Sequence, residues 1–196
     1  MKRRRYYQHP HALVESQQIG KGTRVWAFAH VMRGAMVGRN CNIGEGCFLE
    51  AGVRVGDNVT IKNGCMLWDG VTIEDGAFIG PGVIFTNDVW PRSSRLPEAA
   101  PRYLTRSWLE PTRVGRGATI GAGAILRAGV EIGEFAAVAM GAIVTRSVRA
   151  RALAVGVPAR RTGWVCHCGL RLATEKCAGC GRGYKILTRA ARALTV

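Results

Sequence analysis

The chain has 196 residues, 47% of them hydrophobic, which suffices for one main domain and a small appendage. Its formal net charge is +15, which favours nucleic acid or phosphorylated small molecules as ligands, or serves only to keep the surface soluble. Neither an apolar run of about 18 residues nor an apolar stretch behind the basic start is present, so we predict no membrane span and no secretory signal. Seven cysteines in a chain of this length fit reduced thiols, and we expect a cytoplasmic protein.

A six-residue repeat begins at Ile19 and dominates the chain. Every sixth residue is Ile, Leu or Val, apart from Phe85, and the residue two positions earlier is small or β-branched, apart from Gln17. The large positions are Ile19, Val25, Val31, Val37, Ile43, Leu49, Val55, Ile61, Leu67, Ile73, Ile79 and Phe85, and then Val114, Ile120, Leu126, Ile132, Val138 and Val144.

Each repeat predicts a short β-strand followed by a corner. A spacing of two residues puts the large and the small side chain on the same face of a strand, which we expect to face the core. Glycine often follows the large residue, as at Gly38 and Gly56, and we interpret it as allowing the backbone angles of a corner. Strands and corners in alternation predict a solenoid that coils on itself. The small positions include Cys41, Cys47 and Cys65, which we therefore interpret as core residues.

The repeat is interrupted once, at residues 86–111. Long irregular insertions in compact domains are usually either functional or disordered. This one contains Trp90, Tyr103 and Trp108, which are unfavourable if left free in water. We therefore predict an ordered loop that packs on a neighbouring subunit, with disorder as the alternative.

The pattern resembles the hexapeptide-repeat transferases over residues 9–163. The resemblance implies an all-β fold, a left-handed parallel β-helix with three hexapeptides per coil, and the repeats counted above then give about six coils. We expect a β-helix domain at residues 1–163, with its ejected loop at 86–111, and a small zinc-ribbon-like tail at residues 164–196.

Several motifs narrow the resemblance. "RVWAFAHV", "FTNDVWPRSSR" and "GVPAR" with the following "GW" are similar to N-acetyltransferases of nucleotide-linked 3-amino sugars. The resemblance implies acetyl-CoA as co-substrate, a homotrimer with its active site between subunits, and a role in surface polysaccharide biosynthesis. The expected substrate is UDP-2-acetamido-3-amino-2,3-dideoxyglucuronate, and a dTDP-3-amino-3,6-dideoxyhexose is the alternative.

The same resemblance suggests which residues act on the sugar. Asn87 matches a loop asparagine and is predicted to be catalytic, although asparagine also caps loop turns. His30 is the second catalytic candidate, as a base or a hydrogen-bond partner of the sugar, with a structural role as the alternative. Arg92 is expected to bind a carboxylate or phosphate of the nucleotide sugar, and Trp90 to contact the same substrate.

Acetyl-CoA is expected to lie along the coils. Alignment of "IGAGAIL" and "VAMGAIVTR" with the family's CoA-binding turns assigns Ala122, Met140, Thr145 and Arg146 to the donor arm. Arg160 matches the position that reaches the CoA phosphates, and an ordinary basic end of the solenoid is the alternative.

The tail has a different composition. Cys166, Cys168, Cys177 and Cys180 lie close together, and "CAGCG" has the form of a zinc knuckle. So short a segment lacks a core of its own, and four thiolates satisfy tetrahedral zinc, so we predict a structural zinc site. The first pair is C-x-C, one residue shorter than usual, and a disordered or metal-free tail is the alternative.

Two other functions compete with acetyl transfer. A nucleic-acid-binding protein or a non-catalytic basic scaffold with a zinc ribbon would use the charge, but the sequence lacks a groove-reading helix, and we expect no specific nucleic-acid partner. A zinc hydro-lyase of the γ-carbonic-anhydrase type needs three histidine ligands, whereas only His30 lies in the coils.

Overall fold

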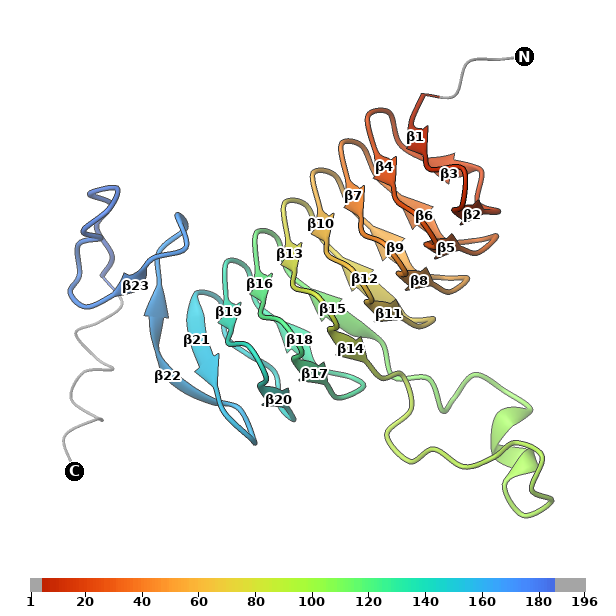
Figure 1. The fold of residues 1–196 in the computed structure, drawn as a ribbon. Coiled ribbons are helices and arrows are strands. Elements are labelled where there is room, and N and C mark those ends of the chain that lie inside the picture. The colour runs from red at the N-terminus through yellow and green to blue at the C-terminus, as the bar shows by residue number, and fades with distance from the viewer. Residues whose placement is uncertain (1–4, 186–196) are drawn as a thin grey trace.

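The computed structural model describes residues 5–185 (Figure 1). Short strands wind into a parallel β-solenoid with three faces, which we call sheets A, B and C. One short 3₁₀-helix, η1 (Ala100–Tyr103), is the helical element of the described chain. None of the helical structure within residues 5–185 has the length and apolar character that crossing a membrane would require.

The strands follow one another from sheet to sheet. Most parallel partners are 18 residues apart, as for Met36 and Arg54, and partners on either side of the long insertion are 41 residues apart, as for Ile84 and Ile125. Sheet A contains β1 (Tyr7–Gln8), β4 (Arg24–Val25), β7 (Asn42–Ile43), β10 (Thr60–Ile61), β13 (Phe78–Ile79), β16 (Thr119–Ile120), β19 (Ala137–Val138), β21 (Ala152–Val155), β22 (Arg160–Val165) and β23 (Arg171–Leu172). Sheet B contains β2 (Leu13–Val14), β5 (His30–Val31), β8 (Phe48–Leu49), β11 (Met66–Leu67), β14 (Ile84–Phe85), β17 (Ile125–Leu126) and β20 (Ile143–Val144). Sheet C contains β3 (Gln18–Ile19), β6 (Met36–Val37), β9 (Arg54–Val55), β12 (Val71–Ile73), β15 (Thr112–Val114) and β18 (Glu131–Ile132).

The stack has about eight turns. Sheet A alone contains eight parallel strands, β1, β4, β7, β10, β13, β16, β19 and β21. The repeats counted from Ile19 to Val144 give about six coils, and the difference comes from both ends. Strands β1 and β2 precede Ile19, and β21 follows Val144, so they extend the solenoid beyond the strictly periodic segment.

The core runs along the axis of the solenoid and confirms the predicted inward positions. The large aliphatic residues from Val25 to Val144 are almost fully buried, and Phe85 fills one of their places. Cys41, Cys47 and Cys65 are buried in the same core, and their thiols donate to backbone carbonyls of the next coil. Burial raises the pKa of the Cys41 thiol, which fits a packing role.

Glycines at the corners serve two different purposes, and our interpretation of the first set was wrong. A Cβ on Gly38 would lie 2.4 Å from the carbonyl oxygen of Gly56 in the next coil, so this position is glycine because the backbones approach closely. The positive φ angle of the corner occurs two residues further on, for example 69° at Gly64 and 58° at Asn58.

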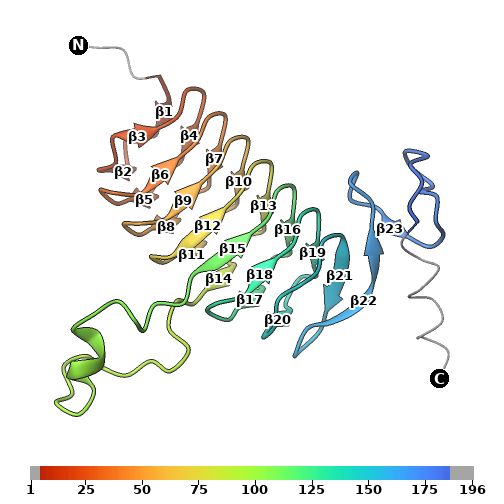
Figure 2. The same cartoon turned by 180° about the vertical axis from the view of Figure 1, so that it is seen from behind.

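The long insertion leaves the stack between β14 and β15. Both views show it projecting from the edge that sheet B forms (Figures 1 and 2). On either side of it the solenoid continues without a gap, because β14 pairs with β17 and β12 pairs with β15. The loop is therefore an addition to the core and does not interrupt it.

The C-terminal segment closes one end of the stack. Strand β22 turns back antiparallel on β21, and β23 is antiparallel to β22 (Figure 2). The domain boundary expected between residues 163 and 164 lies within β22. Residues 1–4 and 186–196, which belong to the predicted domains, lie outside the described residues.

Candidate active site

One row of corners differs from the other two. The corners that follow sheets A and C often begin with glycine, whereas none of the seven corners that follow sheet B does. Their first residues are Glu15, Met32, Glu50, Trp68, Thr86, Arg127 and Thr145. Since glycine marks close backbone approach, this edge has room for side chains. The long loop leaves the solenoid at the same edge, directly after β14.

The root of the loop is tied to the turns on both sides of it. The Thr86 hydroxyl accepts from the Ala128 N–H at 2.8 Å in the following turn. The Asn87 amide donates from Nδ2 to the Asp69 carbonyl at 3.3 Å in the preceding turn, and its backbone carbonyl accepts from Glu110 N–H at 2.9 Å. Nδ2 is thus fixed as the donor end, and within the described residues the Asn87 Oδ1 accepts no hydrogen bond. Asn87 therefore closes the loop and presents a free acceptor.

Asp88 organises the interior of the loop. Its side chain is only 9% exposed and accepts two hydrogen bonds from the Arg102 guanidinium, at 2.6 and 2.9 Å. The Tyr103 hydroxyl donates to the same carboxylate at 2.9 Å, and the Trp90 N–H donates at 2.8 Å. The Arg102 guanidinium is the main reason that the pKa of Asp88 lies below its ordinary value. The loop is thus held together by its own contacts, and its packing on a neighbouring subunit stays a prediction.

A cavity of about 370 Å³ lies between the loop and the next turn of the solenoid. Its lining includes Trp90, Arg102, Trp108 and Arg127, and we call it the loop pocket. Trp90 is 75% exposed, so its ring can contact a ligand. The Arg127 guanidinium has no ion-pair partner in the part of the chain that the structure describes, whereas Arg102 is neutralised by Asp88.

Arg92 does not line the loop pocket. Its side chain is exposed, and Nη1 donates to the carbonyl of Pro91 at 3.0 Å. The sequence reasoning also missed Arg127, although one signal was available. Arg127 follows a buried leucine, at a position where many repeats have glycine.

His30 lies on the outer side of sheet B, away from the loop root. Its Nε2 is 3.1 Å from the Glu15 Oε2, and its ring makes an edge contact with Phe48 at 5.4 Å between centroids. His30 is on β5 and the loop follows β14, three strands away, so the separation is about 14 Å. His30 and Asn87 of one chain therefore do not meet, and one reacting amine could contact both only across two copies.

The residues assigned to the donor fall into two groups on either side of β20. Ala122 and Met140 are exposed on successive turns, at the corner that leads into sheet B, where the Gly141 N–H donates to the Ala122 carbonyl at 2.8 Å. Thr145 and Arg146 lie at the corner that leaves sheet B. The two groups thus lie on two successive turns, at the corners on either side of sheet B, an extended path that suits a long flexible arm.

Arg146 and Arg160 meet in a second cavity. It has a volume of about 200 Å³ and is lined by Arg146, Arg149, Arg160 and Arg161, together with small residues, and we call it the arginine pocket. None of these four side chains forms an ion pair with a carboxylate within residues 5–185. Guanidinium groups that lack carboxylate partners favour phosphate. Sequence reasoning missed Arg149 because the fold alone brings it beside Arg160.

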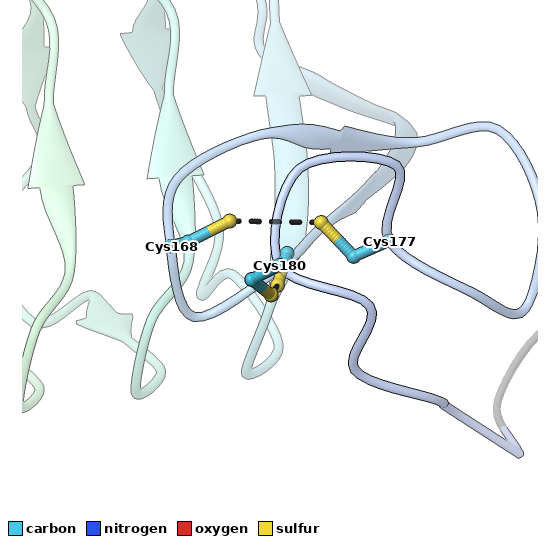
Figure 3. A group of neighbouring side chains, drawn as sticks. Cys168, Cys177 and Cys180 are labelled. Carbon is cyan, nitrogen blue, oxygen red and sulfur yellow. Dashed lines mark hydrogen bonds between the residues drawn. The ribbon is translucent and has the colours of Figure 1, made fainter.

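The four tail cysteines converge as predicted. Their sulfur atoms all lie within 4.8 Å of one another, with 3.4 Å between Cys166 and Cys180 and 3.6 Å between Cys168 and Cys177. Figure 3 shows Cys168 and Cys177 pointing toward each other, with Cys180 beside them. A tetrahedron with metal–sulfur bonds of about 2.3 Å has sulfur atoms about 3.8 Å apart, so the donor set fits zinc.

The Cys166 thiol of this cluster has a lowered pKa. Burial opposes the charged form of Cys166, but hydrogen bonding by the Cys168 backbone and the Tyr184 hydroxyl outweighs it and lowers the pKa to about 6. The Cys166 sulfur is 3.1 Å from that hydroxyl. Thiolate is the form that binds metal, so the lowered pKa favours Cys166 as a ligand. The Leu170 backbone lowers the pKa of Cys168, but hydrogen bonding with Cys166 and Cys177 outweighs it and raises that pKa to about 11.

Comparison with known proteins identifies the family. The model of the bacterial transferase hexapeptide (six repeats) matches residues 18–51 and 52–87, and that of the hexapeptide repeat of succinyl-transferase matches residues 111–146. The dTDP-3-amino-3,6-dideoxy-α-D-galactopyranose 3-N-acetyltransferase of Aneurinibacillus thermoaerophilus is 47% identical over 180 residues, which are 90% of this chain and 89% of the relative. The chain belongs to the hexapeptide-repeat nucleotide-sugar N-acetyltransferases.

Solved structures share the fold of this hexapeptide-repeat N-acetyltransferase. The product of the BC4754 gene of Bacillus cereus has a TM-score of 0.55 at 18% identity, covering 82% of this chain and 78% of the other. A hexapeptide-repeat acetyltransferase of Vibrio cholerae, solved with acetyl-CoA, has a TM-score of 0.53 at 24% identity, covering 67% and 70%.

Family membership also decides between the competing functions. It favours acetyl transfer over a nucleic-acid-binding protein or a non-catalytic scaffold. The γ-carbonic-anhydrase alternative fails on its ligands, because the cysteine cluster is the one group of three or more metal-binding side chains that converges within residues 5–185. The N-acetyltransferase fold thus carries a loop pocket, an arginine pocket and a cysteine cluster.

Proposed function

We propose that this protein transfers the acetyl group of acetyl-CoA to the amino group of a dTDP-linked 3-amino-3,6-dideoxyhexose. The observation that carries the proposal is the 47% identity, over 90% of the chain, to a relative named for that reaction. We thereby prefer the alternative of the sequence analysis over the UDP-linked uronate. The reaction would serve surface polysaccharide biosynthesis, and the seven free thiols suit the reducing cytoplasm.

The chemistry needs a neutral amine beside a polarised thioester. The amine nitrogen bonds to the carbonyl carbon, and the carbon–sulfur bond breaks. The nitrogen loses one proton and the departing CoA thiolate gains one, so the products are an acetamido sugar and the thiol of CoA. A neutral amine already has a lone pair, and therefore no strong protein base is required.

Asn87 is our choice for orienting the amine. Its Nδ2 is held by the Asp69 carbonyl, so its Oδ1 has a fixed direction and can accept a hydrogen bond from the amine N–H. His30, paired with Glu15, would contact the sugar from a neighbouring copy of the chain, because His30 and Asn87 of one chain are three strands apart.

The loop pocket is the proposed site of the nucleotide sugar. Trp90 and Trp108 supply ring faces for the base or sugar, and Arg127 supplies an unpaired charge for the diphosphate. Arg92 stays a prediction for a contact outside this cavity. The acetyl-CoA arm would follow Ala122, Met140 and Thr145, and its phosphates would bind Arg146 and Arg160 in the arginine pocket.

A homotrimer would complete the site. The outward side chains of sheet B form a mostly apolar row, namely Leu13, His30, Phe48, Met66, Ile84, Ile125 and Ile143. The corresponding row of sheet A is mixed, and three successive residues in it, Arg24, Asn42 and Thr60, are polar. An apolar row beside an ordered loop is a surface that another copy of the chain can cover.

We also propose that the cysteine cluster holds one structural zinc ion per chain. The support is the convergence of the four sulfur atoms, which all lie within 4.8 Å of one another. Metal analysis of the purified protein tests this directly. Substantially less than one zinc per chain would count against it.

The test of the reaction is thiol release. Acetyl-CoA and a thiol reagent are incubated with the protein and each of several dTDP- and UDP-linked 3-amino sugars. We expect release that depends on the dTDP-linked amine. The Arg127→Ala variant should raise KM for the nucleotide sugar about tenfold and leave the affinity for CoA unchanged. Absence of release with every amino sugar would refute the proposal.

A further inference from the structure

The cysteine cluster and the arginine pocket are joined by a single strand. Strand β22 begins at Arg160, continues through Arg161 and ends at Val165, and Cys166 comes next. At about 3.3 Å per residue, the two sites are about 20 Å apart along the strand. Whatever fixes the end of β22 therefore also limits the freedom of its beginning.

A second connection runs through side chains. The guanidinium of Arg161 lies over the Trp164 ring, 4.6 Å from its centroid. Trp164 in turn packs against a small cluster of buried residues formed by Cys166, Leu172, Cys177 and Tyr184. A chain of direct contacts thus leads from the sulfur cluster to a residue that lines the arginine pocket.

We call residues 164–185, the segment that contains the four cysteines, the cysteine cap. Apart from the cysteine cluster, few buried side chains stabilise this segment. Its core consists of those four buried residues and the adjoining Trp164, and two of the four are cysteines of the cluster. So small a core does not offset the loss of conformational freedom on folding, whereas a bound metal would.

The cap is docked on the solenoid. The His167 ring lies 4.2 Å from the Phe135 ring between centroids, and the Arg151 guanidinium lies over Tyr184 at 5.4 Å. The Val165 N–H donates to the Arg151 carbonyl at 2.8 Å. All three contacts are made by residues of the cap, and the two ring contacts of His167 and Tyr184 depend on the cap being folded.

We infer that metal bound by the four cysteines positions Arg160 and Arg161 to bind a nucleotide phosphate in the arginine pocket. The inference rests on the proposed function, since it assigns the phosphates of the acetyl donor to that pocket. In this arrangement the metal stabilises the folded cap, and the folded cap fixes the position of Trp164. Trp164 and strand β22 then fix the positions of Arg160 and Arg161.

The experiment measures binding by calorimetry with adenosine 3′,5′-bisphosphate, which has phosphates like those of the donor but no thioester arm. The metal-loaded protein should bind it. Removal of the metal by a thiol reagent and a chelator should weaken binding about tenfold, and reloading should restore it. Cys47→Ala is the matched control, because it removes a buried thiol outside the cluster and should retain both metal and affinity.

Trp164→Leu keeps the inference testable if the metal-free protein unfolds. This variant should retain its metal, bind the bisphosphate about tenfold more weakly, and lose little further affinity when the metal is removed. Bisphosphate binding that is indifferent both to metal and to Trp164→Leu would overturn the inference, while acetyl transfer stood. Conversely, metal-dependent binding of the bisphosphate without acetyl transfer to any amino sugar would support the inferred role of the metal and refute the proposed function.

Discussion

The order of the long loop should depend on the charge of Asp88, and Asp88→Asn tests this. Both carboxylate oxygens accept two hydrogen bonds each, from Arg102 with Trp90 on Oδ1 and from Arg102 with Tyr103 on Oδ2. An amide has only one acceptor oxygen, so its NH₂ group would face two donors in either orientation. The substitution preserves the size of the side chain and therefore isolates this effect.

The expected cost follows from the geometry. Loss of hydrogen bonds to a charged group costs about 1.5 to 3 kcal/mol each. The Arg102 side chain is 34% exposed and can recover some hydration, so we expect a net cost of about 2 kcal/mol. Such a cost raises the population of the open loop about 30-fold. The cost falls on the loop and not on the solenoid, which continues past it through β14 and β17.

Hydrogen exchange measured by mass spectrometry is the assay. Peptides from residues 88–108 should exchange about 30-fold faster in Asp88→Asn, while peptides of the solenoid should not change. Asp57→Asn is the matched control, because Asp57 also accepts on both oxygens from an arginine, Arg39, which is 71% exposed. Solvent screens that exposed ion pair, so it should contribute less to stability than the pair of Asp88 and Arg102. Equal exchange rates of the loop peptides in Asp88→Asn and Asp57→Asn would refute the reasoning.

Acidification should have the same effect as the substitution. The pKa of Asp88 is lowered in the folded loop, chiefly by Arg102. Its contribution is therefore complete above the ordinary value of 3.8 and is lost as the pH falls through the lowered pKa. Loop exchange corrected for intrinsic rates should stay constant down to about pH 4 and increase below it. A loop that opened between pH 5 and 7 would contradict this assignment.

Three further tests address other parts of the structure. Gly38→Ala should lower the free energy of unfolding by about 3 kcal/mol, because its Cβ would overlap backbone atoms 2.4 Å away. Gly64→Ala should lower it by only about 1 kcal/mol, because Gly64 has open space around it and only its φ of 69° is unfavourable for alanine. Equal melting temperatures of the two variants would contradict this distinction. Asn87→Ala should reduce kcat about 100-fold in the thiol-release assay without changing the oligomer, and unchanged turnover would remove Asn87 from the mechanism. Ile84→Glu on the outer face of sheet B should convert the proposed trimer to monomers, measured by light scattering, whereas Phe78→Glu on the outer face of sheet A should not. A monomeric unsubstituted protein would refute the proposed trimer.

The amino-acid sequence by itself determined the solenoid. A period of six with paired inward positions specifies strand, corner and core at once, because each repeat forms and buries its side chains in the same way as its neighbours. The core positions of Ile43, Leu49 and Cys65 followed from that pattern and are confirmed. The convergence of the four tail cysteines could also be anticipated, because they lie close together in the chain.

Which side chains become neighbours at the corners of the solenoid could be established only from the tertiary structure. Three corners form one turn, so most residues 18 apart become neighbours. The row of corners after sheet B, none of which begins with glycine, appears only once the turns are stacked. Arg127 in the loop pocket and Arg149 beside Arg160 depend on that stacking and on the return of β22 along β21. The network around Asp88 has no periodic signal, because an irregular loop is folded by contacts specific to its own side chains.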